Sequence, residues 1–122
     1  MIEYTVRVHK DRTEWYLNGE LHREDGPAIE WKDGSKAWHL NGQSHREDGP
    51  ALEWANGEKQ WYLNGNRHRT DGPAIEYTSG KKAWYLNGQE YTEQEFNQMT
   101  QYKELSVAEI EQLLGYKIKV VR

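Results

Sequence analysis

The chain contains no cysteine and few aliphatic residues, although six tryptophans and eight tyrosines supply large apolar areas. The absence of cysteine excludes disulfides and thiolate metal sites. The first ten residues, MIEYTVRVHK, hold no apolar run of signal-peptide length. No stretch approaches the roughly 18 apolar residues that indicate a membrane span. A formal net charge of −4, with both signs interspersed, argues against binding nucleic acid mainly through phosphates. We therefore expect a soluble, cytoplasmic protein that does not bind nucleic acid.

A 23-residue repeat organises most of the sequence. WYLNG at 15–19 returns as WHLNG at 38–42 and as WYLNG at 61–65 and 84–88. AIEW at 28–31 returns as ALEW at 51–54 and AIEY at 74–77, and TVRV at 5–8 aligns with them as a degenerate first copy. The repeat units lie near 4–19, 20–42, 43–65 and 66–88, so we expect a repeat array over residues 1–90.

Apolar and polar residues alternate inside each unit, which predicts strands with one buried face. In AIEWKDGSKAWHL the alternation predicts one face with Ile29, Trp31, Trp38 and Leu40, and another with Glu30, Ala37 and His39. Between the strands lie dipeptides typical of tight hairpins, namely Asp33-Gly34, Asn56-Gly57 and Ser79-Gly80. The predicted fold is mainly β, an antiparallel meander of about four hairpins and eight strands in a single layer.

Residues 91–122 depart from the repeat and are predicted to form a cap on the array. Thr92 and Glu95 have capping-box spacing and predict a helix over 92–101. Ser106 and Glu109, followed by Gly115, predict a second helix over 106–114. Alternation in YKIKVV predicts a short final strand over 116–121.

The unit WYLNGxxHRxDGPAxEW resembles the MORN repeat, in the variant form found in uncharacterised bacterial and phage proteins. The resemblance extends to the closing segment LSVAEIEQLLGYKIKVV, although HRxDGP stands where a MORN unit usually has HGxG. It implies a single-layer array that serves as a scaffold or as a surface for binding other proteins.

The segment HREDGPA at 22–28 and 45–51, with HRTDGPA at 68–74, could bind a metal, perform acid–base chemistry or form a turn. Equivalent residues of successive hairpins are about 10 Å apart, whereas ligands of one metal ion lie about 2 Å from it. Acid–base catalysis requires a unique, partly desolvated pocket, and the chain shows no nucleophile or phosphate-loop motif. We therefore predict a non-enzyme without metal or cofactor.

A structural corner is the favoured interpretation of this segment. Its glycines, Gly26, Gly49 and Gly72, would allow a left-handed or closely approached backbone, and the prolines that follow would fix φ. Its aspartates, Asp25, Asp48 and Asp71, would accept backbone N–H bonds. Its histidines and arginines would pair with these aspartates or with Glu30, Glu53 and Glu76.

Candidate binding residues lie on the sheet and along the corners. The face of Trp15, Trp38, Trp61 and Trp84 with Leu17, Leu40, Leu63 and Leu86 is predicted to be the more buried. The opposite face is predicted to carry Tyr16, His39, Tyr62 and Tyr85 beside Glu30, Glu53 and Glu76. Tyrosine among charges is typical of protein-binding surfaces, and solvated strand tyrosines fit the pattern equally well. The corner edge adds His22, Arg23, His45, Arg46, His68 and Arg69 as further candidates.

Our leading hypothesis is a non-enzymatic module that binds another protein. By analogy, a phage-encoded module of this kind would inhibit a host defence protein in the bacterial cytoplasm. One alternative is a membrane-surface or lipid-headgroup binder, which would require clustered basic charge. Another is self-assembly into a homo-oligomer through the N-terminal edge strand around Ile2–Val8.

Overall fold

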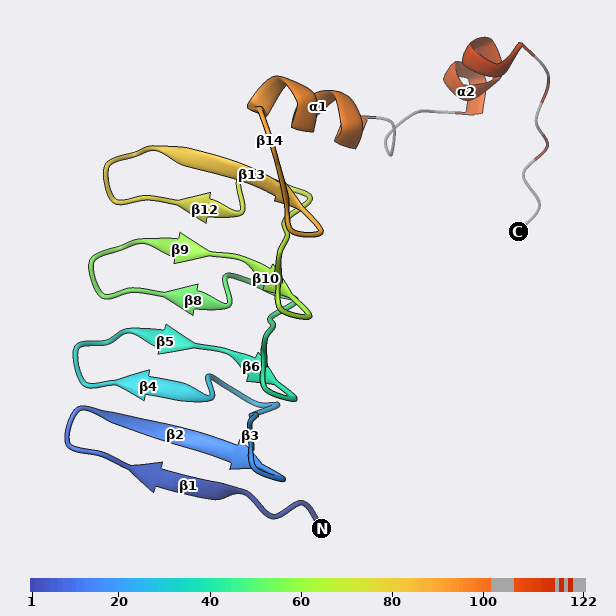
Figure 1. Ribbon diagram of the computed structural model, residues 1–122. Coiled ribbons are helices and arrows are strands. Elements are labelled where there is room, and N and C mark those ends of the chain that lie inside the picture. Colours follow the sequence, from blue (N-terminus) through green and yellow to red (C-terminus); the bar gives the residue numbers. More distant parts are fainter. Residues whose placement is uncertain (102–106, 116, 118, 120–122) are drawn as a thin grey trace.

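The computed structural model describes residues 1–101, 107–115, 117 and 119, and the protein is mainly β (Figure 1). Within these residues the elements are β1 Thr5–Val8, β2 Arg12–Leu17, β3 Glu20–Leu21, β4 Ile29–Trp31, β5 Lys36–Ala37, β6 His39–Leu40, β7 Gln43–Ser44, β8 Leu52–Glu53, β9 Lys59–Gln60, β10 Tyr62–Leu63, β11 Asn66–Arg67, β12 Ile75–Glu76, β13 Lys82–Leu86, β14 Gln89–Tyr91, α1 Glu93–Gln101 and α2 Val107–Leu114. No helix in this part of the chain is long and apolar enough to span a bilayer.

The main sheet is an antiparallel meander, as the repeat predicts. Its strands follow one another in the order β1-β2-β4-β5-β8-β9-β12-β13-β14, and β3 pairs with β2. Figure 1 shows the hairpins stacked in one direction, from β1 at the N-terminal end to β13. The stacking follows from the sequence, because each unit repeats the same strand and turn residues and can pair with the unit before it.

Each unit also contains a second, smaller hairpin that the sequence pattern did not predict. The Asn-Gly pairs close the hairpins β2–β3, β6–β7, β10–β11 and β13–β14. Asn64 and Gly65, for example, have φ of 50° and 83°, the two positive values of a type I′ turn. The described residues therefore contain more and shorter strands than the eight that one hairpin per unit predicts.

The loop between β4 and β5 determines which side chains share a face. Trp31 N–H donates to Ser35 O, Gly34 N–H donates to Trp31 O, and Gly34 has φ of 97°. The loop therefore has three residues and ends in a left-handed glycine, and Ile29 pairs with Ala37. The prediction that Ile29 shares a face with Trp38 is wrong, because a one-residue shift in register moves every partner to the other face.

The register gives the main sheet two distinct faces. The charged face carries a row in which glutamates and lysines alternate across neighbouring strands, namely Glu30, Lys36, Glu53, Lys59, Glu76 and Lys82. The aromatic face carries the row Ile29, Ala37, Leu52, Gln60, Ile75 and Ala83. Because side chains alternate along a strand, Trp15 and Trp84 extend from the charged face, and Tyr16 and Tyr85 from the aromatic face.

The buried interior of this thin sheet consists largely of small side chains. Ala28, Ala51 and Ala74 are at most 1% exposed, and Ile75 is 2% exposed. These alanines occupy equivalent positions at the start of a strand, where the backbone of the preceding hairpin approaches closely. For example, Trp38 N–H donates to Ala51 O at 2.7 Å. Backbone pairing, together with aromatic side chains around this alanine and isoleucine interior, replaces the large aliphatic core that the composition lacks.

The helix α1 begins with the predicted capping box. Thr92 N–H donates to Glu95 Oε1 at 2.9 Å, and Glu95 N–H donates to Thr92 Oγ1 at 3.1 Å. The hydrogen bond from the Thr92 backbone N–H, followed by the interaction with the Thr92 side chain, lowers the pKa of the Glu95 carboxyl group. Phe96 is buried, and α1 packs against β13 and β14 at the end of the sheet.

The helix α2 ends as predicted. Gly115 has φ of 77°, and its N–H donates to Glu111 O. Its predicted N-cap, Ser106, and the predicted strand 116–121 lie outside the described residues.

Candidate functional site

Each HRxDGP corner is organised around its arginine. Arg46 Nε donates to Asp48 Oδ1 at 3.0 Å, and Nη1 donates to Pro50 O at 3.1 Å and to Glu53 Oε1 at 3.3 Å. The guanidinium lies over Trp38, with Cζ 3.8 Å from the ring centroid. The planar guanidinium satisfies these partners in several directions at once, as a lysine could not. The corner is thus held by ion pairs, a backbone hydrogen bond and a cation–π contact.

The same arrangement occurs at the other two corners. Arg23 lies 4.0 Å from the centroid of Trp15, and Arg69 lies 3.8 Å from that of Trp61. Arg23 also contacts Asp25, Pro27 O and Glu30, and Arg69 contacts Asp71, Pro73 O and Glu76. The arginines thus pair with both acidic rows, which the sequence pattern left as alternatives.

The aspartates of the corner differ from the sequence prediction, and the glycines show one of the two predicted alternatives. The aspartates Asp25, Asp48 and Asp71 accept from the arginines, not from backbone N–H groups in a turn. Of the two alternatives predicted for Gly26, Gly49 and Gly72, the left-handed φ does not occur and the close approach does. They are glycines because the guanidinium packs against them: a Cβ on Gly49 would lie 3.0 Å from Arg46 Cζ.

The corner histidines connect successive units. Nδ1 of His22, His45 and His68 accepts the backbone N–H of Asn41, Asn64 and Asn87 at 2.9 Å, in the Asn-Gly turn of the next unit. His22 is also buried, with 6% exposure. These hydrogen bonds occupy the Nδ1 lone pairs, and no group of three potential metal ligands occurs in the described part of the chain. The histidines therefore hold the array together.

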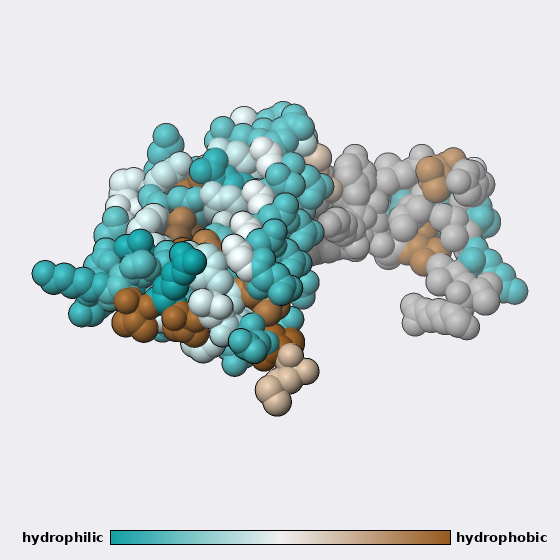
Figure 2. All heavy atoms as spheres, turned by 60° about the horizontal axis from the view of Figure 1, so that its bottom comes forward, coloured by the Kyte–Doolittle hydropathy of each residue, from teal (hydrophilic) through white to brown (hydrophobic). Residues whose placement is uncertain are grey.

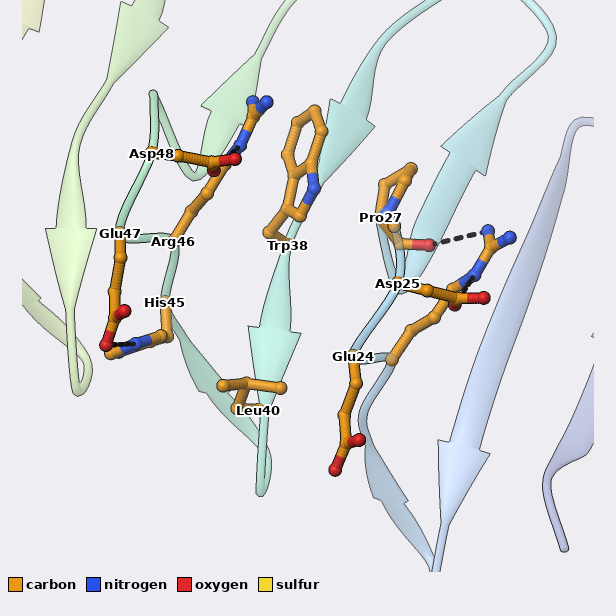
Figure 3. A pocket seen from close by; sticks show the side chains of 11 residues that line it. Glu24, Asp25, Pro27, Trp38, Leu40, His45, Arg46, Glu47 and Asp48 are labelled. Carbon is orange, nitrogen blue, oxygen red and sulfur yellow. Dashed lines mark hydrogen bonds and ion pairs between the residues drawn. The ribbon is translucent and has the colours of Figure 1, made fainter. Parts of the chain in front are cut away.

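A groove of about 720 Å³ lies between the first two corners. In Figure 3, Trp38 stands between them, with Arg46 on one side and Pro27 on the other. Leu40 adds to the apolar floor, and the carboxylates of both corners line the sides. The wall residues are Arg23, Glu24, Asp25 and Gly26 from one corner and His45, Arg46, Glu47 and Asp48 from the next.

The aromatic face brings together part of the predicted binding set. Tyr16 and Tyr85 lie on it. Tyr62 lies on the same face as Gln60, to whose Oε1 its hydroxyl donates at 2.9 Å. His39 takes the equivalent position in its unit, and all four side chains are half-buried. The predicted neighbours Glu30, Glu53 and Glu76 are instead on the charged face with the corner arginines. The predicted single surface is therefore two surfaces, because the hairpin register differs by one residue.

The aromatic face also holds two tryptophans that the sequence pattern does not place beside the tyrosines. Trp31 and Trp54 lie two positions beyond Ile29 and Leu52, their ring centroids are 5.8 Å apart, and Trp54 is 40% exposed. The three-residue loop, with its glycine in the third position, is the signal that would have placed them here. The guanidinium of Arg67 lies over two rings of this face, with its Cζ 5.8 Å from the centroid of Tyr62 and 5.4 Å from that of Tyr85.

His39 is the exception in this row of tyrosines. Burial lowers its pKa, an effect that a hydrogen bond with the Ala37 backbone partly offsets. Folding therefore disfavours protonation of this imidazole.

The N-terminal edge of the sheet exposes apolar side chains. Val6 and Val8 in β1 are 42% and 80% exposed, and Ile2 is 55% exposed. Figure 2 brings this end forward and shows hydrophobic groups along its lower border, beneath a largely hydrophilic surface. Self-assembly through β1 stays a prediction.

Comparison with models of protein families finds no match. Comparisons with curated proteins and with solved structures find no significant match.

Proposed function

We propose that the protein is a non-enzymatic binding module that takes another protein onto its aromatic face. The observation that carries this proposal is the row of half-buried Tyr16, His39, Tyr62 and Tyr85, continued by Trp31, Trp54 and Tyr77 at the other end of the strands. Half-buried aromatic side chains on a backbone-paired sheet offer large contact area and lose little conformational entropy on binding.

Charge supports a protein partner over a lipid surface. The lysines of the charged face, Lys36, Lys59 and Lys82, alternate in register with glutamates, so their charge does not accumulate into a basic patch. On the aromatic face the cations Arg7 and Arg67 lie over tyrosine rings, at 4.8 Å from Tyr16 and 5.4 Å from Tyr85. Tyrosine with arginine is the composition of protein-binding hot spots.

The test is affinity capture from the native cells with the wild-type protein and two double variants. Tyr62→Ala with Tyr85→Ala removes two rings of the aromatic face, and the expected result is loss of the captured partner. An alanine truncation at a hot spot costs about 2 kcal/mol, so the pair should weaken binding by at least about a hundredfold. Lys59→Ala with Lys82→Ala changes the same two units on the charged face and should leave capture unchanged.

Circular dichroism establishes that both double variants fold. Equal capture by all three proteins would refute the assignment of the face. If the wild-type protein captures no partner protein and sediments with anionic vesicles, the lipid-binding alternative is favoured.

A further inference from the structure

The groove between the first two corners has a floor and walls of different chemistry. Its floor is apolar, formed by Trp38 and Leu40 with Pro27 beside them. Its walls hold two arginines and four carboxylates, which leaves a formal charge of −2 with His45 neutral. The groove lies at the corners, which fold over the charged face, and it is therefore separate from the aromatic face.

The excess negative charge belongs to Glu24 and Glu47. Each corner arginine already has two carboxylate partners, Asp25 and Glu30 for Arg23, and Asp48 and Glu53 for Arg46. Oε1 of Glu24 instead lies 3.5 Å from Nε2 of His22, and Oε1 of Glu47 lies 3.5 Å from Nε2 of His45. The side chains of the two glutamates are 62% and 83% exposed. Figure 3 shows the two side chains extending in the same direction on either side of Leu40.

We propose that this groove binds a basic segment of a partner protein. An arginine or lysine of that segment would lay its alkyl stem on Trp38 and Leu40 and place its cation between Glu24 and Glu47. Long basic side chains bury their stems on apolar surface and keep the charged group at a polar rim, as this groove requires. The corner itself shows that the chemistry is favourable, because Arg46 lies over the same Trp38 ring. This site goes beyond the proposed function and does not depend on it.

The third corner provides an internal comparison. It has Thr70 where the first two corners have Glu24 and Glu47, and its arginine makes the same contacts. Threonine is therefore compatible with the corner, and Glu24→Thr with Glu47→Thr removes the two charges while keeping a side chain that the repeat already accepts. Conversely, Thr70→Glu should place the same acidic pair, with Glu47, at the equivalent position beside Trp61.

The experiment is an NMR titration of the tryptophan indole N–H signals with a short glycine peptide that carries one central arginine. The matched peptide carries citrulline, which has nearly the same shape and no charge. The arginine peptide should shift the Trp38 signal, and citrulline should not. Loss of both glutamates should weaken binding about tenfold at low salt, as expected for two exposed ion pairs. Thr70→Glu should add a shift at Trp61.

The control for general attraction to an acidic protein is Glu3→Thr with Glu90→Thr, which removes the same charge from two exposed sites outside the groove. Its affinity for the arginine peptide should stay within about twofold of wild type. The proposal is overturned if citrulline binds equally, if both double variants lose affinity equally, or if Trp38 does not shift. Because the Glu24→Thr, Glu47→Thr and Thr70→Glu changes leave the aromatic face intact, capture of the partner by these proteins reports on the proposed function separately.

Discussion

Gly49→Ala is the sharpest test of the corner. Alanine at a position with an allowed backbone usually stabilises a protein by about 0.4–1 kcal/mol, because it restricts the unfolded chain. The φ of Gly49 is not left-handed, so the backbone does not forbid alanine. Its Cβ would, however, lie 3.0 Å from Arg46 Cζ and 3.2 Å from Nη1. The guanidinium must therefore shift, and the shift would disturb its contacts with Trp38, Pro50 O and Glu53.

The cost follows from the contacts that Arg46 would weaken. The cation–π contact contributes about 0.5–1 kcal/mol, the hydrogen bond to Pro50 O about 1 kcal/mol, and the pair with Glu53 at most about 1 kcal/mol. Loss of most of these contacts, set against the gain from a stiffer unfolded chain, predicts a net destabilisation of about 1–2 kcal/mol.

Combining Gly49→Ala with Arg46→Ala completes a double-mutant cycle. Without the guanidinium, Gly49→Ala should become neutral or slightly stabilising, which gives a coupling energy of about 2 kcal/mol. Urea unfolding followed by tryptophan fluorescence measures all four proteins. If Gly49→Ala costs the same with and without Arg46, packing of the guanidinium is not the reason for the glycine.

Two further predictions concern single positions. Because burial lowers the folded pKa of His39, protonation favours the unfolded state, and stability falls as the pH drops below about 6.5 and through the folded pKa. His39→Tyr, which installs the residue of the other units, should reduce this decline in urea midpoints between about pH 7 and 5; an identical decline would contradict the assignment. Asn64 has φ of 50°, so Asn64→Ala should cost about 1 kcal/mol while Asn64→Gly stays within about 0.5 kcal/mol. Equal costs for the two would show that left-handed backbone strain does not determine the residue there.

The hairpin array could be predicted from the sequence because its signals are local. Alternation indicates strands, the Gly-containing dipeptides mark turns, and Thr92 with Glu95 marks the start of a helix. None of these signals depends on a distant part of the chain, and all three are confirmed in the structure.

The surfaces could not be predicted as well, because they depend on one residue of register. Asp33-Gly34 is compatible with a two-residue or a three-residue loop, and only the latter pairs Ile29 with Ala37. The same three-residue loop length places Tyr85 and Glu76 on opposite faces of the sheet. It also places Trp38 on the face where Arg46 lies over its ring. The role of Gly49 depends in turn on that stacked guanidinium, a contact that a repeat pattern does not reveal.

The central claim, that the aromatic face binds the partner, is tested most directly by site-specific photocrosslinking in the native cells. A photoreactive phenylalanine analogue would replace Tyr62 on the aromatic face or, in a second protein, Lys59 on the charged face. We predict a crosslinked partner from position 62 and none from position 59. A crosslink from position 59 alone would contradict the account.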